Sequence, residues 1–439
     1  MFADMRPPAR VVASEAPEAC LRSCLRDELC CAWSYRFGWC SLYGAQLLQC
    51  ASGAAAANGT AGGVAERCLN NRFEHKVMLR RDRNWQARVA TVATWPDKSS
   101  LGAQAKYFNL VERARDGALL LFARFDLKPL LDRFETLVWP ATANESTWSA
   151  ATPAILFGRA ADVPQGWSFS HNLGLLADGD TVDAFGGQYR ARRWPEAPGI
   201  LHATLDADDP ASLDLKALRV SPPAVVPEPS TCYELRGDES RPRSQGCEFD
   251  GKLSAVRFRG KVLLYGRANI NARSGARHVQ VAAALAPGAP FGPFDLVSFV
   301  HYPVGPGAPV ASVASWNIYF ATVHQNPIDN GASLVGMFPV LTPRDSCVAL
   351  AVSVDGHAFS ELECIATASR ARATGEQSDH PVDGLVVRGD HAYFYVSFDL
   401  PVAGPSGGAP RMDRYAIPLD VLADFTHQAK KQLKASQQM

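Results

Sequence analysis

The residues of this chain that could do chemistry are acids and imidazoles placed just before apolar, strand-like segments. The densest group is Asp379, His380 and Asp383, two carboxylates and one imidazole within five residues. Glu248 and Asp250 occupy the corresponding place ahead of another strand-like segment. Carboxyl groups with different pKa values are the usual carriers of general acid–base chemistry, so these four acids are candidate catalytic residues.

Further polar residues lie at similar strand starts or, for Arg267, in a later strand, and are suited to contact a ligand by hydrogen bonding or ring stacking. Each has a plain structural alternative: a histidine can be satisfied within a core, Asp-Gly is often a turn, and an arginine can form an ordinary ion pair. The candidate ligand-contacting residues are His171, Asn172, Lys252, Arg267, Asn317, Tyr319 and His380.

A weak internal repeat places these groups. Each copy opens with a polar cluster, continues into an alternating apolar strand, and passes through a Gly/Asp turn into a second strand. The four copies cover residues 168–187, 249–267, 316–323 and 380–396. A first, less similar copy is predicted from strands at 89–94, 107–112 and 118–125. Repeated antiparallel meanders of this kind indicate a β-propeller, in which the polar strand starts converge on one axis.

A resemblance to a known family rests on two stretches within the repeat. Ser353-Val-Asp355-Gly356-His-Ala-Phe359-Ser360 is similar to a turn phrase of glycosidase propellers, and residues 265–281 have the same character. Residues 75–420 thus resemble the five-bladed glycoside hydrolase superfamily of arabinanases, xylosidases and invertases. The resemblance implies an all-β fold, a five-bladed β-propeller, and axial carboxylates that act on a glycan.

Glycoside hydrolysis needs two carboxyl groups, about 5 Å apart for retention and roughly 6.5–9.5 Å apart for inversion. The favoured pair is Asp250 and Asp383, with Glu248 or Asp379 as partner acid. The second copy opens with His171 where the family would have a carboxylate, which departs from the family pattern. A lectin-like or adhesion protein that binds sugar without cleaving it is the alternative, and a purely structural extracellular scaffold is the third interpretation.

Residues 10–70 form a separate, cysteine-rich segment. Seven of the eleven cysteines precede residue 69, a density typical of disulfide frameworks in oxidising compartments. Helical spacing over 16–27, followed by strands at 30–35 and 39–43, predicts a small α+β fold. The cysteine pattern resembles the PAN/apple module, which implies an extracellular domain that binds proteins or glycans; a disulfide-rich cap without a binding role is the alternative.

Bulk composition limits the partners. Lysine plus arginine and aspartate plus glutamate are both 44, so no net charge favours nucleic acid, and a carbohydrate partner fits better. No apolar run reaches the roughly 20 residues of a membrane span. Sequons at Asn58 and Asn144 agree with a secreted glycoprotein, although no signal peptide is visible.

No cofactor is expected beyond a conceivable axial metal ion. Residues 421–439 are expected to be a solvated helix or frayed end. Cys232 with Cys247 and Cys347 with Cys364 look like two local pairs.

Overall fold

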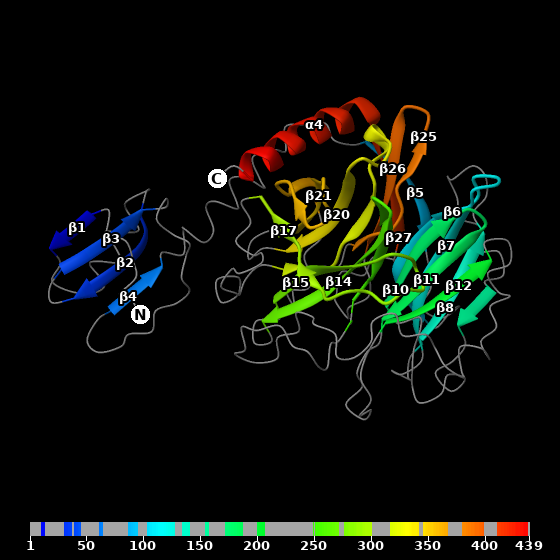
Figure 1. Cartoon of the computed structure of the whole chain (residues 1–439), viewed down its shortest axis with the longest axis horizontal. Helices are drawn as coiled ribbons and strands as arrows, with labels where there is room; N and C mark the ends of the chain where they lie inside the picture. Colours follow the sequence, from blue (N-terminus) through cyan, green and yellow to red (C-terminus); the bar gives the residue numbers. More distant parts are fainter. Residues whose placement is uncertain are drawn as a thin grey trace, which may run out of the picture. The chain divides into compact units, whose positions relative to one another are not determined.

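The computed structural model divides the chain into two compact units, Met1–Asp82 with His301–Ala314, and Arg83–Val300 with Ser315–Met439. We call them unit 1 and unit 2 and describe each by itself (Figure 1). The structure describes residues 10–13, 30–36, 39–44, 61–64, 87–94, 103–127, 134–140, 154–157, 172–187, 200–206, 249, 251–271, 276–300, 317–341, 346–367, 380–398 and 411–437.

Unit 1 contains one four-stranded sheet in the order β1-β3-β2-β4. Its strands are β1 (Arg10–Ala13), β2 (Cys30–Arg36), β3 (Trp39–Gly44) and β4 (Ala61–Val64). β2 and β3 pair antiparallel, with Trp33 opposite Leu42, so the strands expected at 30–35 and 39–43 are confirmed. The helix expected over 16–27 lies outside the described residues, and the apple-like identity of this unit stays a prediction.

The described strands of unit 2 form five sheets that are almost entirely antiparallel. The first contains β6 (Ala103–Glu112), β7 (Leu119–Leu127), β8 (Phe134–Pro140) and β9 (Ala154–Phe157), and the second β10 (Asn172–Asp178), β11 (Thr181–Gly187) and β12 (Ile200–Asp206). The third contains β13 (Ser254–Phe258), β14 (Lys261–Asn271), β15 (Ala276–Ala284) and β16 (Asp295–Leu296).

The fourth sheet contains β17 (Ser298–Phe299), β18 (Asn317–Ile318), β19 (Thr322–Gln325), β20 (Leu334–Leu341), β21 (Ser346–Ser353), β22 (Ala358–Phe359) and β23 (Glu363–Thr367). The fifth contains β24 (His380–Pro381), β25 (Val386–Arg388), β26 (His391–Phe398), β27 (Arg411–Pro418) and β5 (Ala87–Thr94).

Tight turns join the first two strands of these sheets, as the Gly/Asp signals predict. Phe258 pairs with Lys261, so only Arg259 and Gly260 form the turn between β13 and β14. Both have positive φ, 50° and 74°, which is the twist that a two-residue hairpin requires. The turn after β10 uses Gly179 at φ 63° in the same way.

The innermost strands of the five sheets follow one another around a ring. β6 contacts β10, β10 contacts β13, β13 contacts β19, and β20 of the fourth sheet contacts β24 of the fifth. A parallel bridge between Asn109 and Asp383 then joins the fifth sheet back to the first. Unit 2 is therefore an all-β, propeller-like fold, and residues far apart in the sequence meet at its centre.

From the sequence we expected the segment 89–94 to belong to the first sheet. The structure shows that it does not. It forms β5, which pairs antiparallel with β27, with Arg411 opposite Thr94. The pairing of an early strand with the last strand adds a second closure to the ring. Such a partner is more than 300 residues away in the chain, so local alternation could not reveal it.

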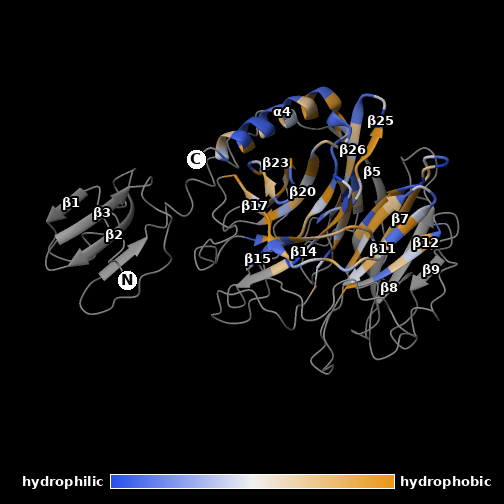
Figure 2. Cartoon of the chain, viewed as in Figure 1, coloured by the Kyte–Doolittle hydropathy of each residue, from blue (hydrophilic) through white to orange (hydrophobic). Residues whose placement is uncertain are grey.

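The expectation of a solvated C-terminal helix is wrong. α4 (Leu419–Ser436) buries Leu422, Phe425, Ala429 and Leu433, and the first three pack in one core with residues of β20, β21, β26 and β27. Its Thr426 and Lys430 also contact Asn326 and Asp329 through hydrogen bonds. Figure 2 shows hydrophilic and apolar residues alternating along α4, as one buried face requires.

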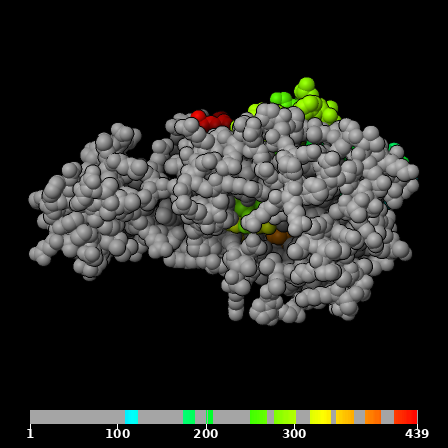
Figure 3. Space-filling view, turned by 90° about the horizontal axis from the view of Figure 1, so that it is seen from below, coloured from blue at the N-terminus to red at the C-terminus, as the bar shows by residue number. Residues whose placement is uncertain are grey.

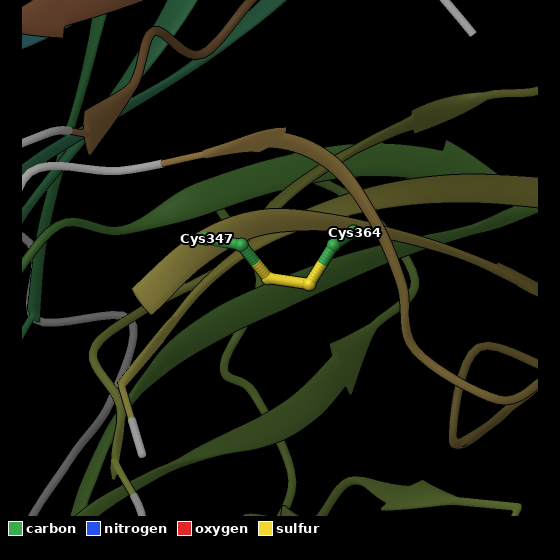
Figure 4. The surroundings of a disulfide bond; sticks show 2 residues. All are labelled: Cys347 and Cys364. Carbon is green, nitrogen blue, oxygen red and sulfur yellow. A yellow bond between two sulfur atoms is a disulfide. The ribbon is translucent and has the colours of Figure 1, made fainter. Parts of the chain in front are cut away.

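One disulfide is described. Cys347 of β21 and Cys364 of β23 are bonded across neighbouring strands, which confirms this local pair (Figure 4). The pair Cys232 and Cys247 lies outside the described residues. In the described part of the chain, no helix has both the length and the apolar composition of a bilayer span.

Candidate functional site

Asp383 lies where the ring of sheets closes. Its backbone N–H donates to the carbonyl of Phe108 at 3.1 Å, and its carbonyl accepts the N–H of Leu110 at 2.5 Å. These two bonds dock the segment between β24 and β25 onto β6. The residue is 5% exposed, so its carboxylate is buried at the junction of the first and fifth sheets.

Two further sheets supply contacts to the Asp383 carboxylate. The hydroxyl of Ser254, at the start of β13, donates to Oδ1 at 3.2 Å and accepts the N–H of Val323 at 3.0 Å. Nε2 of His324, on β19, lies 3.1 Å from the same Oδ1 and accepts the N–H of Gly384 at 3.2 Å. Among the described residues, the second oxygen Oδ2 has no hydrogen-bond partner.

Lys252 is the cation beside this carboxylate and is fully buried. Its ammonium donates to the carbonyl of Phe108, the same oxygen that accepts the N–H of Asp383. Burial lowers the pKa of Lys252 from 10.5 to about 7, while the negative charge of Asp383 raises it in part. A buried lysine that titrates near neutrality beside a carboxylate is a feature of functional sites.

Aromatic rings and arginines lie next to this pair. The rings of Tyr319 and His380 are stacked, with centroids 5.2 Å apart and planes 13° apart. The guanidinium carbons of Arg277 and Arg267 lie 4.7 Å and 5.5 Å from the centre of the Tyr319 ring. Lys252 lies 5.9 Å from the centre of the Phe320 ring, which itself contacts His380. We call Lys252, Arg267, Arg277, Tyr319, His380 and Asp383 the axial cluster.

Two residues of the cluster, Arg277 and Tyr319, are only partly buried. Figure 3 shows a hollow near the middle of the surface, in which described atoms have green, yellow and orange colours. These colours belong to described segments between about residue 250 and residue 400.

A pocket of about 410 Å³ lies along the second halves of the inner strands. We call it the axial pocket. Asp383 and His324 contribute to its wall, so the carboxylate borders both the cluster and the pocket. Its lining residues are 109–112, 175–177, 255–257, 324–325 and 383–386, which come from all five sheets.

Two glycines bring the backbone close to this site. Gly251 and Gly384 each follow an aspartate, and each has φ 149°, a region that other residues rarely occupy. A Cβ on Gly384 would lie 2.6 Å from Cβ of Leu110, and one on Gly251 would lie 2.9 Å from Cβ of Arg267. The Asp-Gly repeat thus reflects the same backbone conformation in two sheets.

The structure brings together Asp383, Lys252, Arg267, Tyr319 and His380 from the residues singled out in the sequence. Asn317 lies on β18 opposite Leu341, and Asn172 begins β10, although its side chain is outside the described residues. The remaining four candidates also lie outside them: Asp250, Glu248, Asp379 and His171.

Sequence reasoning missed Ser254 and His324, the two side chains in closest contact with the Asp383 carboxylate. Ser254 follows Lys252 closely on the same strand start, which is a signal that could have found it. His324 is one polar residue in an alternating strand and carries no such signal. His278, beside Arg277, is buried and bonded to the carbonyl of Val297; burial lowers its pKa to about 4, as suits a neutral core residue.

No metal site is formed by the described residues, because no three His, Cys, Asp or Glu side chains in those ranges are grouped as ligands. An axial ion would need ligands from other parts of the chain. The axial metal stays a prediction of the sequence.

No family model and no curated protein sequence matches this chain. Among solved structures, it is similar to an N-acetylgalactosamine deacetylase from F. plautii, with 11% identity over 78% of this chain and 98% of that chain (TM-score 0.47). It is similar to a mannose phosphorylase from Leishmania mexicana, with 9% identity over 79% and 94% (TM-score 0.45). An alpha-L-arabinanase from Penicillium chrysogenum shows 12% identity over 76% and 99% (TM-score 0.44). The propeller-like fold of unit 2 is shown by its own sheets and their contacts.

Proposed function

We propose that unit 2 is a five-bladed propeller in which each of the five sheets is one blade, and that its axial cluster acts on a glycan. Asp383 is the carboxylate of the reaction, and the protein is a glycoside hydrolase-like enzyme of the extracellular space. The observation that carries the proposal is the setting of Asp383. It is buried, held by groups from three other segments of the ring, and has one oxygen without a described partner.

The contacts of Asp383 fit a carboxylate that must keep one position and one oxygen for a substrate. Ser254 donates to Oδ1 and His324 lies beside the same oxygen, while Lys252 supplies the opposite charge nearby. An orphaned buried acceptor is costly in a purely structural role, and ordinary folding tends to eliminate it. Oδ2 can therefore serve as base toward water or as nucleophile toward a sugar carbon.

The neighbouring rings fit the sugar. Tyr319 is only partly buried, and its ring is stacked on His380 with Arg277 and Arg267 beside it, so its accessible part is the place where a sugar would contact it. In this proposal Tyr319 and His380 hold the sugar ring while Lys252 balances the charge of Asp383. The second carboxyl group, the acid, comes from Asp250, Glu248 or Asp379.

The direct test is Asp383→Asn, which keeps the shape of the side chain and removes its charge. We expect the variant to lose release of reducing ends from the glycan that the parent cleaves, by about a thousandfold or more, while it still binds that glycan. Glu112→Gln is the matched control, since Glu112 is an exposed carboxylate of the same ring of strands. Equal cleavage by the parent and Asp383→Asn would contradict the assignment.

Binding without cleavage is the second candidate function, and the burial of Asp383 favours it. At 5% exposure the carboxylate is reached by a sugar only through a rearrangement of its neighbours. Saturable glycan binding with no reducing ends released across a polysaccharide screen would select this lectin-like function. In the same proposal unit 1 binds a protein partner, and binding of extracellular proteins to the full chain tests this role.

A further inference from the structure

One ring nitrogen of His324 faces two groups of opposite polarity. Its Nε2 lies 3.1 Å from Oδ1 of Asp383 and 3.2 Å from the backbone nitrogen of Gly384. An ionised carboxylate accepts hydrogen bonds, whereas a backbone N–H donates one. Nε2 carries either a hydrogen or a lone pair in the ring plane, so it bonds to one of these two neighbours at a time. The role of His324 therefore depends on which ring nitrogen holds its hydrogen.

The carboxylate is the stronger of the two partners. A hydrogen bond to a charged group is roughly twice as strong as one between neutral groups. The N–H of Gly384, at 3.2 Å, is at the long end of the usual range for a hydrogen bond. A bare Nε2 would also hold its lone pair toward the oxygen of Asp383 at 3.1 Å, and the two would repel each other. A hydrogen on Nε2 replaces this repulsion with a bond.

The axial pocket allows His324 to keep a hydrogen on Nε2. Gly384 and His324 both line the pocket, and His324 is only partly buried. At about 410 Å³ the pocket has room for several water molecules. Water there can accept the N–H of Gly384 and can bond to Nδ1, the ring nitrogen that points away from Asp383. The bond from Nε2 to the carboxylate then leaves both of these groups satisfied.

Ser254 and His324 approach the same oxygen of Asp383 from different strands. The hydroxyl of Ser254 donates from the start of β13 at 3.2 Å, and Nε2 of His324 reaches Oδ1 from β19. In the described part of the pocket wall, the charged residues Glu112 and Arg257 are each bonded to a residue of opposite charge. Two donors on Oδ1 fix the rotation of the carboxyl group, so Oδ2 keeps one direction.

We propose that His324 is a positioning residue for Asp383: it carries a hydrogen on Nε2, donates it to Oδ1 and so holds Oδ2 toward the glycan. The inference rests on the proposed function, because His324 acts on the glycan only through Asp383. It also gives the axial pocket a role that differs from that of the axial cluster. The cluster contacts the sugar, whereas water in the pocket keeps the hydrogen of His324 on the nitrogen that faces the carboxylate.

NMR of the full chain, labelled with ¹⁵N at its histidines, tests where the hydrogen lies. The chain has ten histidines, so the His324 signals are identified as those missing in His324→Gln. At neutral pH we expect the Nε2 shift of a nitrogen that bears hydrogen, and a change in this shift in Asp383→Asn, which removes the charge of the acceptor.

Two NMR results would overturn the inference. The first is a bare Nε2 with the hydrogen on Nδ1 alone, because His324 would then serve only as acceptor for Gly384. The second is an Nε2 shift that is the same in the parent and in Asp383→Asn. Neither measurement uses a glycan, so both are independent of the proposed function.

Two substitutions separate positioning from packing. His324→Gln keeps an N–H donor that can reach Oδ1, whereas His324→Leu fills the space without a donor. With the glycan that the parent cleaves, we expect kcat to fall by about a hundredfold in His324→Leu and by less than about tenfold in His324→Gln, with KM unchanged in both. A merely structural role of the ring would make the two variants behave alike.

His391→Leu is the matched control, since His391 is bonded to Asp390 at 2.6 Å at the start of β26 and is not part of the pocket wall. It should cleave like the parent. Equal kcat in the parent and His324→Leu, or an equal loss in His324→Leu and His324→Gln, would overturn the positioning role. If the parent cleaves no glycan, the proposed cleavage fails, and the NMR result still decides whether His324 donates to Asp383.

Discussion

The axial cluster and the axial pocket share Asp383 but handle charge differently. In the pocket, Glu112 pairs with Arg388 at 2.8 Å and Arg257 pairs with Asp178, so its charged residues have ordinary ion partners. In the cluster, the ammonium of the buried Lys252 donates to the carbonyl of Phe108, and burial lowers its pKa to about 7. A charge that is buried without a bonded counter-ion destabilises the folded state. Because such charges are typical of functional sites, we assign the function to the cluster and not to the pocket.

The largest effect that we expect is on the pH dependence of the unfolding free energy, compared between the parent and Lys252→Met. Unfolded chains keep the lysine proton up to pH 10.5, whereas the folded protein releases it at about pH 7. Folding then expels a proton in this window, so the stability of the parent rises with pH and that of the variant does not. We expect the difference in unfolding free energy to move in favour of the parent by roughly 1 kcal/mol for each pH unit above about 7.

Urea unfolding of the parent and of Lys252→Met across this range measures the difference. Lys261→Met is the control, because Lys261 is exposed at the start of β14 and should show no such trend. A difference between parent and Lys252→Met that stays constant from neutral to alkaline pH would show that Lys252 titrates as an ordinary surface lysine.

The next largest effects are the losses of stability that we expect when Gly384 or Gly251 is replaced by alanine. Gly384→Ala places a Cβ against the Cβ and the backbone carbonyl oxygen of Leu110, 2.6 Å and 2.9 Å away, and backbone cannot yield easily. Gly251→Ala meets only the side chain of Arg267, which can shift. We expect losses of about 3 kcal/mol for Gly384→Ala and about 2 kcal/mol for Gly251→Ala, measured by denaturant unfolding.

The two glycine variants should also differ in function. Gly251→Ala displaces Arg267 and should weaken glycan binding by the folded protein. Gly389→Ala is the control for the positive φ alone, since a Cβ there has no atom within 4 Å. Equal losses in Gly384→Ala and Gly389→Ala would mean that the close approach to Leu110 contributes nothing.

These glycines also show how much of the molecule the sequence could predict. The Asp-Gly repeat identified two segments with the same backbone conformation, and the alternating strands around them were predicted correctly. The residue after the glycine differs between the two segments, a lysine after Gly251 and a leucine after Gly384. The repeat does not explain this difference. Local patterns report strand and turn propensity, and the residue types report possible chemistry.

What the sequence could not provide is long-range pairing. The contact of Ser254 with Asp383 spans 129 residues, and the pairing of β5 with β27 spans the whole of unit 2. α4 was predicted as a helix, but its basic residues drew attention away from Leu422, Phe425 and Leu433, which recur at the helical period and pack in the core. In each of these cases the sequence did not predict which surfaces pack together. That packing is determined when the ring of sheets closes.

Ser254→Ala tests the hydrogen bonds by which Ser254 links the Asp383 carboxylate to the backbone of Val323. It removes the donor to Oδ1 of Asp383 and the acceptor for the N–H of Val323, leaving buried polar atoms without partners. We expect a loss of about 2 kcal/mol in unfolding free energy. Thermal and urea unfolding measure it, and an unchanged stability would show that these two bonds are replaced by water.

The smallest expected effect is that of Glu112→Gln in the axial pocket. The side chains of Glu112 and Arg388 are 40% and 35% exposed, and such ion pairs add little to stability. We expect a change below about 0.5 kcal/mol and no change in glycan binding. A large loss of glycan binding in Glu112→Gln would move the functional site from the cluster to the pocket.

A crystal structure of the chain with a bound glycan tests the central claim most directly. The account predicts a sugar ring that contacts Tyr319 and His380, with Asp383 facing the sugar. A sugar held instead in the axial pocket beside Glu112 and Gln325, or bound to unit 1 alone, would contradict it.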